Sequence, residues 1–196
     1  TILSGDIGIQ GDSTDNTIHV VEASNIDNTA ILDGFTITGA NSAGIVRGGG
    51  LNILNGSPEI SNCRIADNYA NGGGAFTIEG IDAEPTFTSC VIEGNTSTGG
   101  GGAMIVGWKA LPTFQSCSFI ENSGTTGGCL SIFGPETYAV FNDCLFQENH
   151  SSYVGGAVSS LDRSRPSFDN CDFIGNEAET TGGAVFSNNC ALTLDN

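Results

Sequence analysis

The stretch PTFTSCVIEGN at residues 85–95 recurs 27 residues later as PTFQSCSFIEN at residues 112–122. Five units of this kind follow one another. Each has a cysteine, an Ile or Phe three residues before it, an Ile or Phe two residues after it and an asparagine five residues after it. The cysteines are Cys63, Cys90, Cys117, Cys144 and Cys171, and the asparagines are Asn68, Asn95, Asn122, Asn149 and Asn176. A fixed period of this length predicts a solenoid, in which each unit packs only against its neighbours.

A second block follows each asparagine after a short loop. It consists of two glycines, a small residue and an apolar residue. The five copies are Gly73-Gly74-Ala75-Phe76, Gly101-Gly102-Ala103-Met104, Gly127-Gly128-Cys129-Leu130, Gly155-Gly156-Ala157-Val158 and Gly182-Gly183-Ala184-Val185. The preceding loop is one residue longer in some units and the following segment one residue shorter, so the cysteines stay 27 residues apart. This compensation indicates coils stacked in register, because a net change in length would have to bulge outward.

Each unit contains three short segments with β-strand character: one at Pro-x-Φ (Φ is Ile or Phe), one at Cys-x-Φ and one after the glycine pair. The three-residue step from Phe114 to Cys117 does not fit one regular strand, because alternate side chains point to opposite faces. The polar residue before each cysteine therefore marks a corner. The sequence predicts an all-β fold, a right-handed parallel β-helix solenoid with three short strands per 27-residue coil and almost no helix. Its coils should lie about 4.8 Å apart.

Residues 1–196 are expected to form a single β-helix domain. Residues 30–196 are predicted to form regular 27-residue coils, the first with Asn41 in the asparagine position, whereas residues 1–29 form an irregular first coil or coils. At the other end, Leu194-Asp195-Asn196 matches Phe168-Asp169-Asn170, one residue before the next cysteine would be due. We therefore expect an excerpt of a longer chain whose neighbouring coils cover the ends, or else copies of this chain that meet end to end.

The chain is strongly acidic, with 22 Asp and Glu against 5 Lys and Arg and a net charge of -17. Charge of this sign repels the phosphates of nucleic acids and of anionic lipids, and no apolar stretch is long enough to span a bilayer. We therefore expect no nucleic-acid partner and no direct membrane insertion. A solvated acidic surface that keeps an extracellular protein soluble is the simplest interpretation, and calcium is the one cofactor that the acidic residues leave open.

The alternation of Gly-Gly-Ala-Φ with Phe-x-x-Asn, as in Gly101-Gly102-Ala103-Met104 and Phe119-Ile120-Glu121-Asn122, resembles the repeats of chlamydial polymorphic outer membrane proteins. It also resembles related right-handed β-helix proteins of bacterial cell surfaces. The likeness covers about residues 30–196, with Ile65 and Ile92 in place of the Phe in two of the five units. Those relatives are typically large secreted or surface-displayed proteins, adhesins among them. The resemblance implies an extracellular or cell-surface location, with glycans or a host surface as partners.

The cysteine column predicts packing rather than chemistry. Like positions on stacked strands hold their Cβ atoms about 4.8 Å apart and parallel, whereas a disulfide needs about 3.8 Å and converging bonds. We therefore expect free, buried thiols, and a straight column cannot supply the tetrahedral convergence of a metal site. The asparagine column is also predicted to be structural, because asparagine tolerates left-handed angles at a turn and its stacked amides can form a ladder. Cys129 and Cys190 lie outside the column.

Catalysis on such a fold would need calcium-binding carboxylates with a base, or a carboxylate pair. The carboxylates near the asparagine corner are Asp67, Glu93, Glu121 and Glu148. These acids, and Arg163 and Arg165 in one loop, are expected to be scattered over different coils and corners. We therefore predict no catalytic, cofactor-binding or metal-binding residue. Trp108 and Tyr138 occupy corresponding loops, where their rings could stack on sugars or simply pack in the loop.

The leading interpretation is a non-enzymatic structural or adhesive segment of a secreted or surface-displayed bacterial β-helix protein. One alternative is an extracellular filament subunit that stacks end to end. The other is a carbohydrate-active enzyme resembling the polysaccharide lyases, or a glycan-binding remnant of one.

Overall fold

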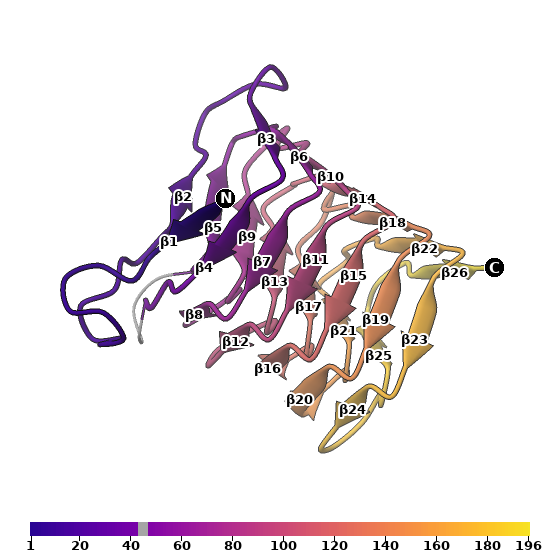
Figure 1. The fold of residues 1–196 in the computed structure, drawn as a ribbon. Coiled ribbons are helices and arrows are strands. Elements are labelled where there is room, and N and C mark those ends of the chain that lie inside the picture. Colours follow the sequence, from indigo (N-terminus) through magenta and orange to yellow (C-terminus); the bar gives the residue numbers. More distant parts are fainter. Residues whose placement is uncertain (43–46) are drawn as a thin grey trace.

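The molecule is a single stack of β-coils. The structure, a computed structural model, describes residues 1–42 and 47–196, and within these residues it contains 26 strands and no helix. The chain climbs from one end of the stack to the other, so its two termini lie at opposite ends (Figure 1). The predicted all-β parallel solenoid is confirmed.

Two sheets of the stack contain the Cys-x-Φ and Pro-x-Φ segments, and all their strand pairs are parallel. The cysteine sheet comprises β1 (Ile2–Ser4), β4 (Thr36–Thr38), β7 (Arg64–Ala66), β11 (Val91–Glu93), β15 (Ser118–Ile120), β19 (Leu145–Gln147) and β23 (Asp172–Ile174). The proline sheet comprises β3 (Ile31–Asp33), β6 (Glu59–Ser61), β10 (Thr86–Thr88), β14 (Thr113–Gln115), β18 (Val140–Asn142), β22 (Ser167–Asp169) and β26 (Thr193–Asp195).

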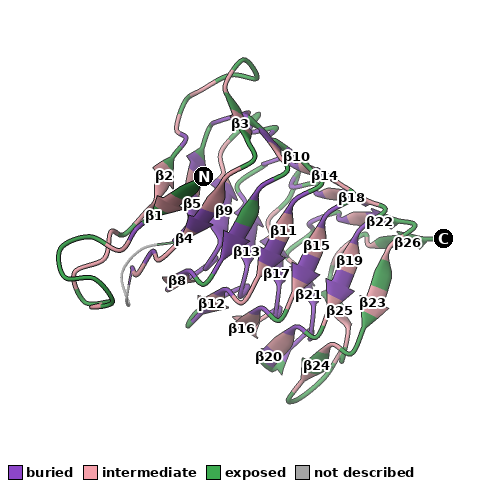
Figure 2. Ribbon diagram, in the orientation of Figure 1, coloured by how far each residue is buried: buried purple, intermediate pink, exposed green. Residues whose placement is uncertain are grey.

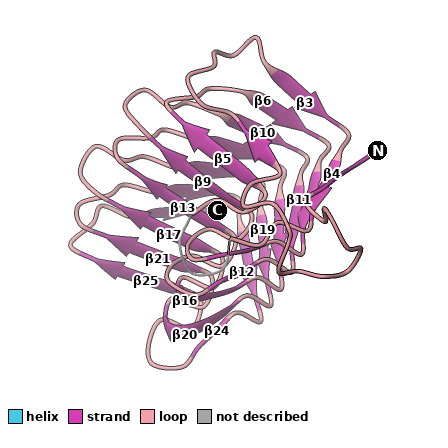
Figure 3. Cartoon of the chain, turned by 90° about the vertical axis from the view of Figure 1, so that its left-hand side faces the viewer, coloured by secondary structure: helices cyan, strands magenta, loops and turns pink. Residues whose placement is uncertain are grey.

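The third face is the glycine sheet, whose strands are stacked in sequence order in Figure 3. It comprises β2 (Val21–Glu22), β5 (Leu51–Leu54), β9 (Phe76–Glu79), β13 (Met104–Gly107), β17 (Leu130–Phe133), β21 (Val158–Leu161) and β25 (Val185–Asn188). Its strands alternate between side chains that point inward, such as Phe76 and Ile78, and side chains that point outward, such as Glu79. The three predicted strands per coil are therefore present.

Five coils add a fourth short strand, which the sequence analysis did not predict. The short sheet comprises β8 (Tyr69–Ala70), β12 (Thr96–Ser97), β16 (Ser123–Thr126), β20 (His150–Val154) and β24 (Glu177–Ala178). These residues directly follow the asparagine column and carry few large apolar side chains, so hydrophobic alternation gave no signal for them. The strands form because the chain stays extended here and pairs with its copy one coil away, as in the 3.0 Å bond from Thr96 N to Asn68 O.

The coil length becomes regular only after the second coil. Strand pairing advances by 34 residues from Ile2 to Thr36, by 28 from Thr36 to Arg64 and then by 27 from Arg64 to Val91. Residues 1–29 thus belong to one wide coil. The extra residue in the next coil makes the prediction for Asn41 wrong, because Asn41 pairs with Tyr69. Its neighbour Ala40 therefore faces Asn68.

Left-handed backbone conformations mark two corners of each coil. The polar residues before the cysteines have φ between 50° and 53°: Asn62, Ser89, Ser116, Asp143 and Asn170. They confirm the predicted corner. The asparagines themselves are not left-handed, contrary to expectation; the residue before each of them is, with φ between 52° and 63° at Asp67, Gly94, Glu121, Glu148 and Gly175. The turn is made by this outer residue, which leaves the asparagine side chain free to point inward.

Columns of like side chains fill the interior (Figure 2). The rings of Phe87, Phe114, Phe141 and Phe168 stack with their centroids 4.7–4.8 Å apart. A second column of Phe119, Phe146 and Phe173 has a spacing of 4.8 Å. The two columns meet edge to face at 5.5–5.9 Å, an arrangement that suits the quadrupoles of the rings. The ring spacing agrees with the predicted distance between coils.

Substitution of Phe114 by alanine should therefore destabilise the protein strongly. The side chain is fully buried and has a ring stacked on each face. We expect a loss of about 3–5 kcal/mol in the free energy of unfolding, measured by urea titration, because the cavity cannot collapse between fixed coils. Phe173→Ala, at a half-buried ring, is the control and should cost less. A loss below about 1 kcal/mol for Phe114→Ala would contradict a core position.

Candidate functional site

The asparagine column forms a continuous hydrogen-bonded ladder along one interior corner. The side-chain Nδ2 of each asparagine donates to the Oδ1 of the next, at 3.1, 3.1, 3.0 and 2.9 Å from Asn68 to Asn176. The same Oδ1 also accepts the backbone N–H of the preceding asparagine, as in the 3.0 Å bond from Asn95 N to Asn122 Oδ1. The ladder starts at Ala40, whose N–H donates to Asn68 Oδ1 at 3.1 Å.

Each ladder amide has one further partner, a carbonyl of the cysteine sheet in the coil before. For Asn122 this acceptor is Ile92 O at 3.0 Å. Asn122 is fully buried, so each of these bonds satisfies a group that water cannot reach. Stacked in this way, the amides hold the corner together and face the interior, away from any ligand.

The column cysteines are free thiols directed at backbone carbonyls. Each Sγ lies 3.5–3.7 Å from a carbonyl oxygen of the preceding coil. Cys63, Cys90, Cys117 and Cys144 are buried, whereas Cys171, in the last coil of the column, is half-buried. Burial raises the pKa of the Cys63 thiol, and that of Cys129 outside the column is raised well above its usual range for the same reason. These thiols are therefore protonated and weakly nucleophilic at neutral pH.

The carboxylates considered from the sequence are divided between two positions. Asp67, Glu121 and Glu148 all occupy the outer, left-handed column beside the ladder, so they are less scattered than expected. Glu93 lies apart from them on β11 and forms an ion pair with Arg64. Among residues 1–42 and 47–196, no group of three or more His, Cys, Asp or Glu side chains is arranged to hold a metal ion.

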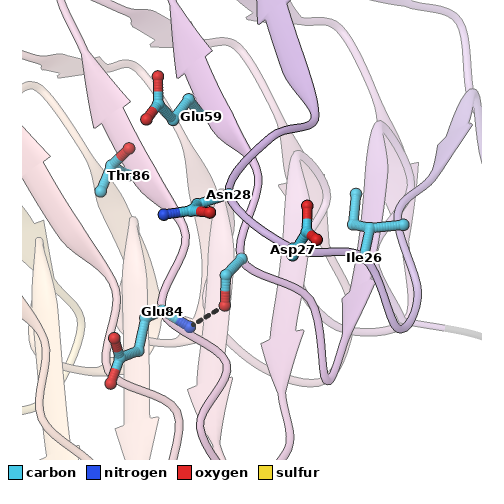
Figure 4. Close-up of a pocket in the computed structure, with 7 residues that line it drawn as sticks. Ile26, Asp27, Asn28, Glu59, Glu84 and Thr86 are labelled. Atoms are coloured by element: carbon cyan, nitrogen blue, oxygen red, sulfur yellow. Dashed lines mark hydrogen bonds between the residues drawn. The ribbon is translucent and has the colours of Figure 1, made fainter.

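An acidic pocket opens between the proline sheet and the loop that follows β2. It has a volume of about 490 Å³, and Glu59 and Thr86 line it from the paired strands β6 and β10. Figure 4 shows Asn28 and Asp27 on the loop beside these strands, with Glu84 across the opening. Asp27 accepts hydrogen bonds from the hydroxyl and the N–H of Thr29, which lower its pKa and keep it ionised.

Exposed aromatic and apolar side chains gather at the end of the glycine sheet, which we call the aromatic edge. It comprises Ile81, Trp108, Phe133, Pro135 and Tyr138. Trp108 directly follows β13 and is 64% exposed, and it lines two hollows. The first, of about 430 Å³, is completed by residues of the two preceding coils, including Leu54 and Ile81. The second, of about 370 Å³, is completed by Phe133 and Pro135 of the following coil.

The ring of Phe133 lies over Gly107, where an added Cβ would come within 2.8 Å of it. A glycine at this position is thus what allows Phe133 to lie close to the strand beside Trp108. The structure brings Trp108 and Tyr138 to neighbouring coils, as the sequence suggested, without stacking their rings on each other. Instead, the Tyr138 ring is covered by Arg165, whose Cζ lies 5.6 Å from the ring centroid.

A comparison with protein families agrees with this architecture. The description of a right-handed β-helix region matches residues 7–196. The chain belongs to the right-handed β-helix region family. Neither the curated proteins nor the solved structures that were compared gave a match. Membership of the right-handed β-helix family confirms the predicted handedness of the solenoid.

Two further observations concern this β-helix. No helix in the described parts of the chain is long and apolar enough to cross a bilayer. The sequence analysis pointed to Trp108 and Tyr138 but missed Ile81, Phe133 and Pro135, because these residues stand at different places in their own units. The available signal was the position directly after each glycine-sheet strand, where side chains of successive coils converge.

Loss of an interior amide should be costly in this β-helix. Asn122→Ala removes the only printed acceptor of Asn95 N and the donor to Ile92 O, in a place closed to water. We expect a loss of about 2–4 kcal/mol in the free energy of unfolding, because each buried unsatisfied group costs about 1–3 kcal/mol. Asn176→Ala, at the half-buried end of the ladder, should cost less. Equal losses would show that the amides are not coupled along the stack.

The thiols should differ in reactivity according to their burial. In the native protein we expect Cys171 and Cys190 to react with a thiol reagent first, because they are half-buried. The five buried thiols should react only after denaturation, when all seven cysteines become accessible. An intact Cys90–Cys117 disulfide in protein denatured without reductant would contradict the column geometry.

Proposed function

We propose that this β-helix is a non-enzymatic structural and adhesive segment of a secreted or surface-displayed bacterial protein. The observation that carries the proposal is the aromatic edge, where an exposed Trp108 stands between two hollows on a scaffold held by interior ladders. Binding surfaces on rigid elements lose little conformational entropy when they engage a partner. The resemblance of the repeats to those of polymorphic outer membrane proteins supports the same location and role.

The interior chemistry supports a structural role for the stack. The thiols and amides that could act on a substrate are directed at backbone atoms inside the coils, as with Cys117 and Asn122. Parallel strands paired on every face resist bending and shear, because a distortion breaks hydrogen bonds in several sheets at once. Such a rod suits the display of a binding surface at a distance from a cell.

A second candidate function is a carbohydrate-active enzyme, and the acidic pocket is the observation that favours it. Asp27, Glu59 and Glu84 converge there from three coils, and a carboxylate pair is the usual machinery of glycoside hydrolysis. The general acid of such a pair needs a raised pKa. The lowered pKa of Asp27 fits that role poorly, so we rank the enzyme second.

A combined binding and turnover assay distinguishes the two functions. The purified protein is incubated with extracellular polysaccharides, and the bound fraction and newly formed chain ends are measured in the same sample. We expect retention without cleavage. Cleavage that is lost in Glu59→Gln, with Thr86→Ser as the matched control in the same pocket, would overturn the adhesive proposal in favour of the enzyme. Cleavage that requires Arg163 or Arg165 would overturn it too.

A further inference from the structure

The aromatic edge also indicates which class of ligand the β-helix takes. We infer that it binds an uncharged polysaccharide, laid along the solenoid axis, with one sugar unit in each of the hollows beside Trp108. This inference rests on the proposed adhesive function and adds the chemistry of the ligand, its direction and its contact residues.

The direction follows from the arrangement of the two hollows. One is formed with residues of the coils before Trp108 and the other with residues of the coil after it, so the line that joins them runs along the stack. Both share Trp108 and Lys109. A linear glycan repeats at a distance similar to the spacing of the coils, so successive sugar rings can meet successive coils. The indole separates the hollows and offers its apolar surface to the C–H faces of both sugars.

The backbone at Trp108 is a second sign of selection for this side chain. The residue after each glycine-sheet strand is left-handed, and the other coils place Gly, Asn or Asp there, the residues that tolerate this conformation. These residues are Asn25, Asn55, Gly80, Gly134, Asp162 and Asn189, with φ between 50° and 118°. Trp108 holds the same conformation at φ 57°, although a bulky side chain is disfavoured there. The column thus accepts strain at the one coil where an aromatic ring projects between two hollows.

The charges at the edge favour an uncharged ligand over a polyanion. The cations are already engaged: Arg47 lies 2.6 Å from Glu79 and Lys109 lies 2.5 Å from Glu136. Arg47 also lies 5.9 Å from the Phe133 ring centroid, so it supports the platform. The net charge of -17 repels an acidic polysaccharide as a whole. Paired ions at the rim can still exchange hydrogen bonds with sugar hydroxyls.

Tyr138 is distinguished from Trp108 by its surroundings. Tyr138 is 37% exposed, compared with 64% for Trp108, and Arg165 covers its ring. It lines neither hollow. The two aromatic residues of corresponding loops therefore have different roles, and Tyr138 serves as the matched control for Trp108.

The test measures binding of two soluble oligosaccharides of equal length to the full chain. One is a neutral β-linked glucan and the other is an oligogalacturonate. Trp108 is the single tryptophan of the chain, so its fluorescence reports on the proposed site directly. We expect the neutral oligosaccharide to change this fluorescence and the acidic one to leave it unchanged. By calorimetry, Trp108→Asn should weaken neutral binding by about tenfold or more, and Tyr138→Ala by less than about twofold.

The asparagine variant keeps the fold testable, since Asn55 and Asn189 occupy the same left-handed column in other coils. Unfolding by urea should show it to be at least as stable as the parent chain. Equal binding of the acidic oligosaccharide, or equal losses in the two variants, would overturn the inference while leaving an adhesive role intact. Adhesion to cells without binding of either sugar would also overturn the inference alone. Cleavage of the neutral chain would overturn the proposed function itself.

Discussion

Parallel hydrogen bonding between coils in register is the constraint on which every other feature of this protein depends. Once a strand pairs with its copy one coil later, each side chain must rest on the equivalent side chain at the distance between coils. That distance, seen in the 4.7–4.8 Å spacing of the phenylalanine rings, suits only side chains that pack well against themselves. Flat rings stack, amides exchange hydrogen bonds and small thiols fill the remaining space. The 27-residue period of the sequence is the trace of this requirement.

The asparagine ladder solves the problem that a closed coil creates at its inner corners. A turn interrupts the strand ladder and leaves backbone groups without partners where water cannot enter. The amides supply those partners, since each accepts two N–H groups from the coil before and donates to a buried carbonyl, as in the bond from Asn95 to Ile65 O. The left-handed residue outside the ladder completes the turn. Interior polarity and exterior shape at this corner are thus set by two adjacent residues.

The outer corners are where the coils are free to differ. A residue there rests on no equivalent interior column, so insertions and unusual side chains cost little as long as the strands on either side keep their register. The acidic pocket and the aromatic edge both arise at such corners, from loops of neighbouring coils. Trp108 takes a left-handed position that other coils fill with Gly, Asn or Asp. Its neighbours in the two hollows are brought to it by the stacking alone.

The sequence by itself determined the solenoid, the strand after each glycine pair, the corner before each cysteine and the identity of the interior columns. It could do so because register makes each of these features periodic, and periodicity is visible without coordinates. The fourth strand escaped detection because its residues lack the alternation of a half-buried sheet. Asn41 was misplaced because one extra residue shifts a coil without changing its pattern. Only the tertiary structure decided that Ile81, Phe133 and Pro135 gather around Trp108, and that Arg165 covers Tyr138. Those contacts join different coils at unequal positions of the repeat, where no sequence period exists to predict them.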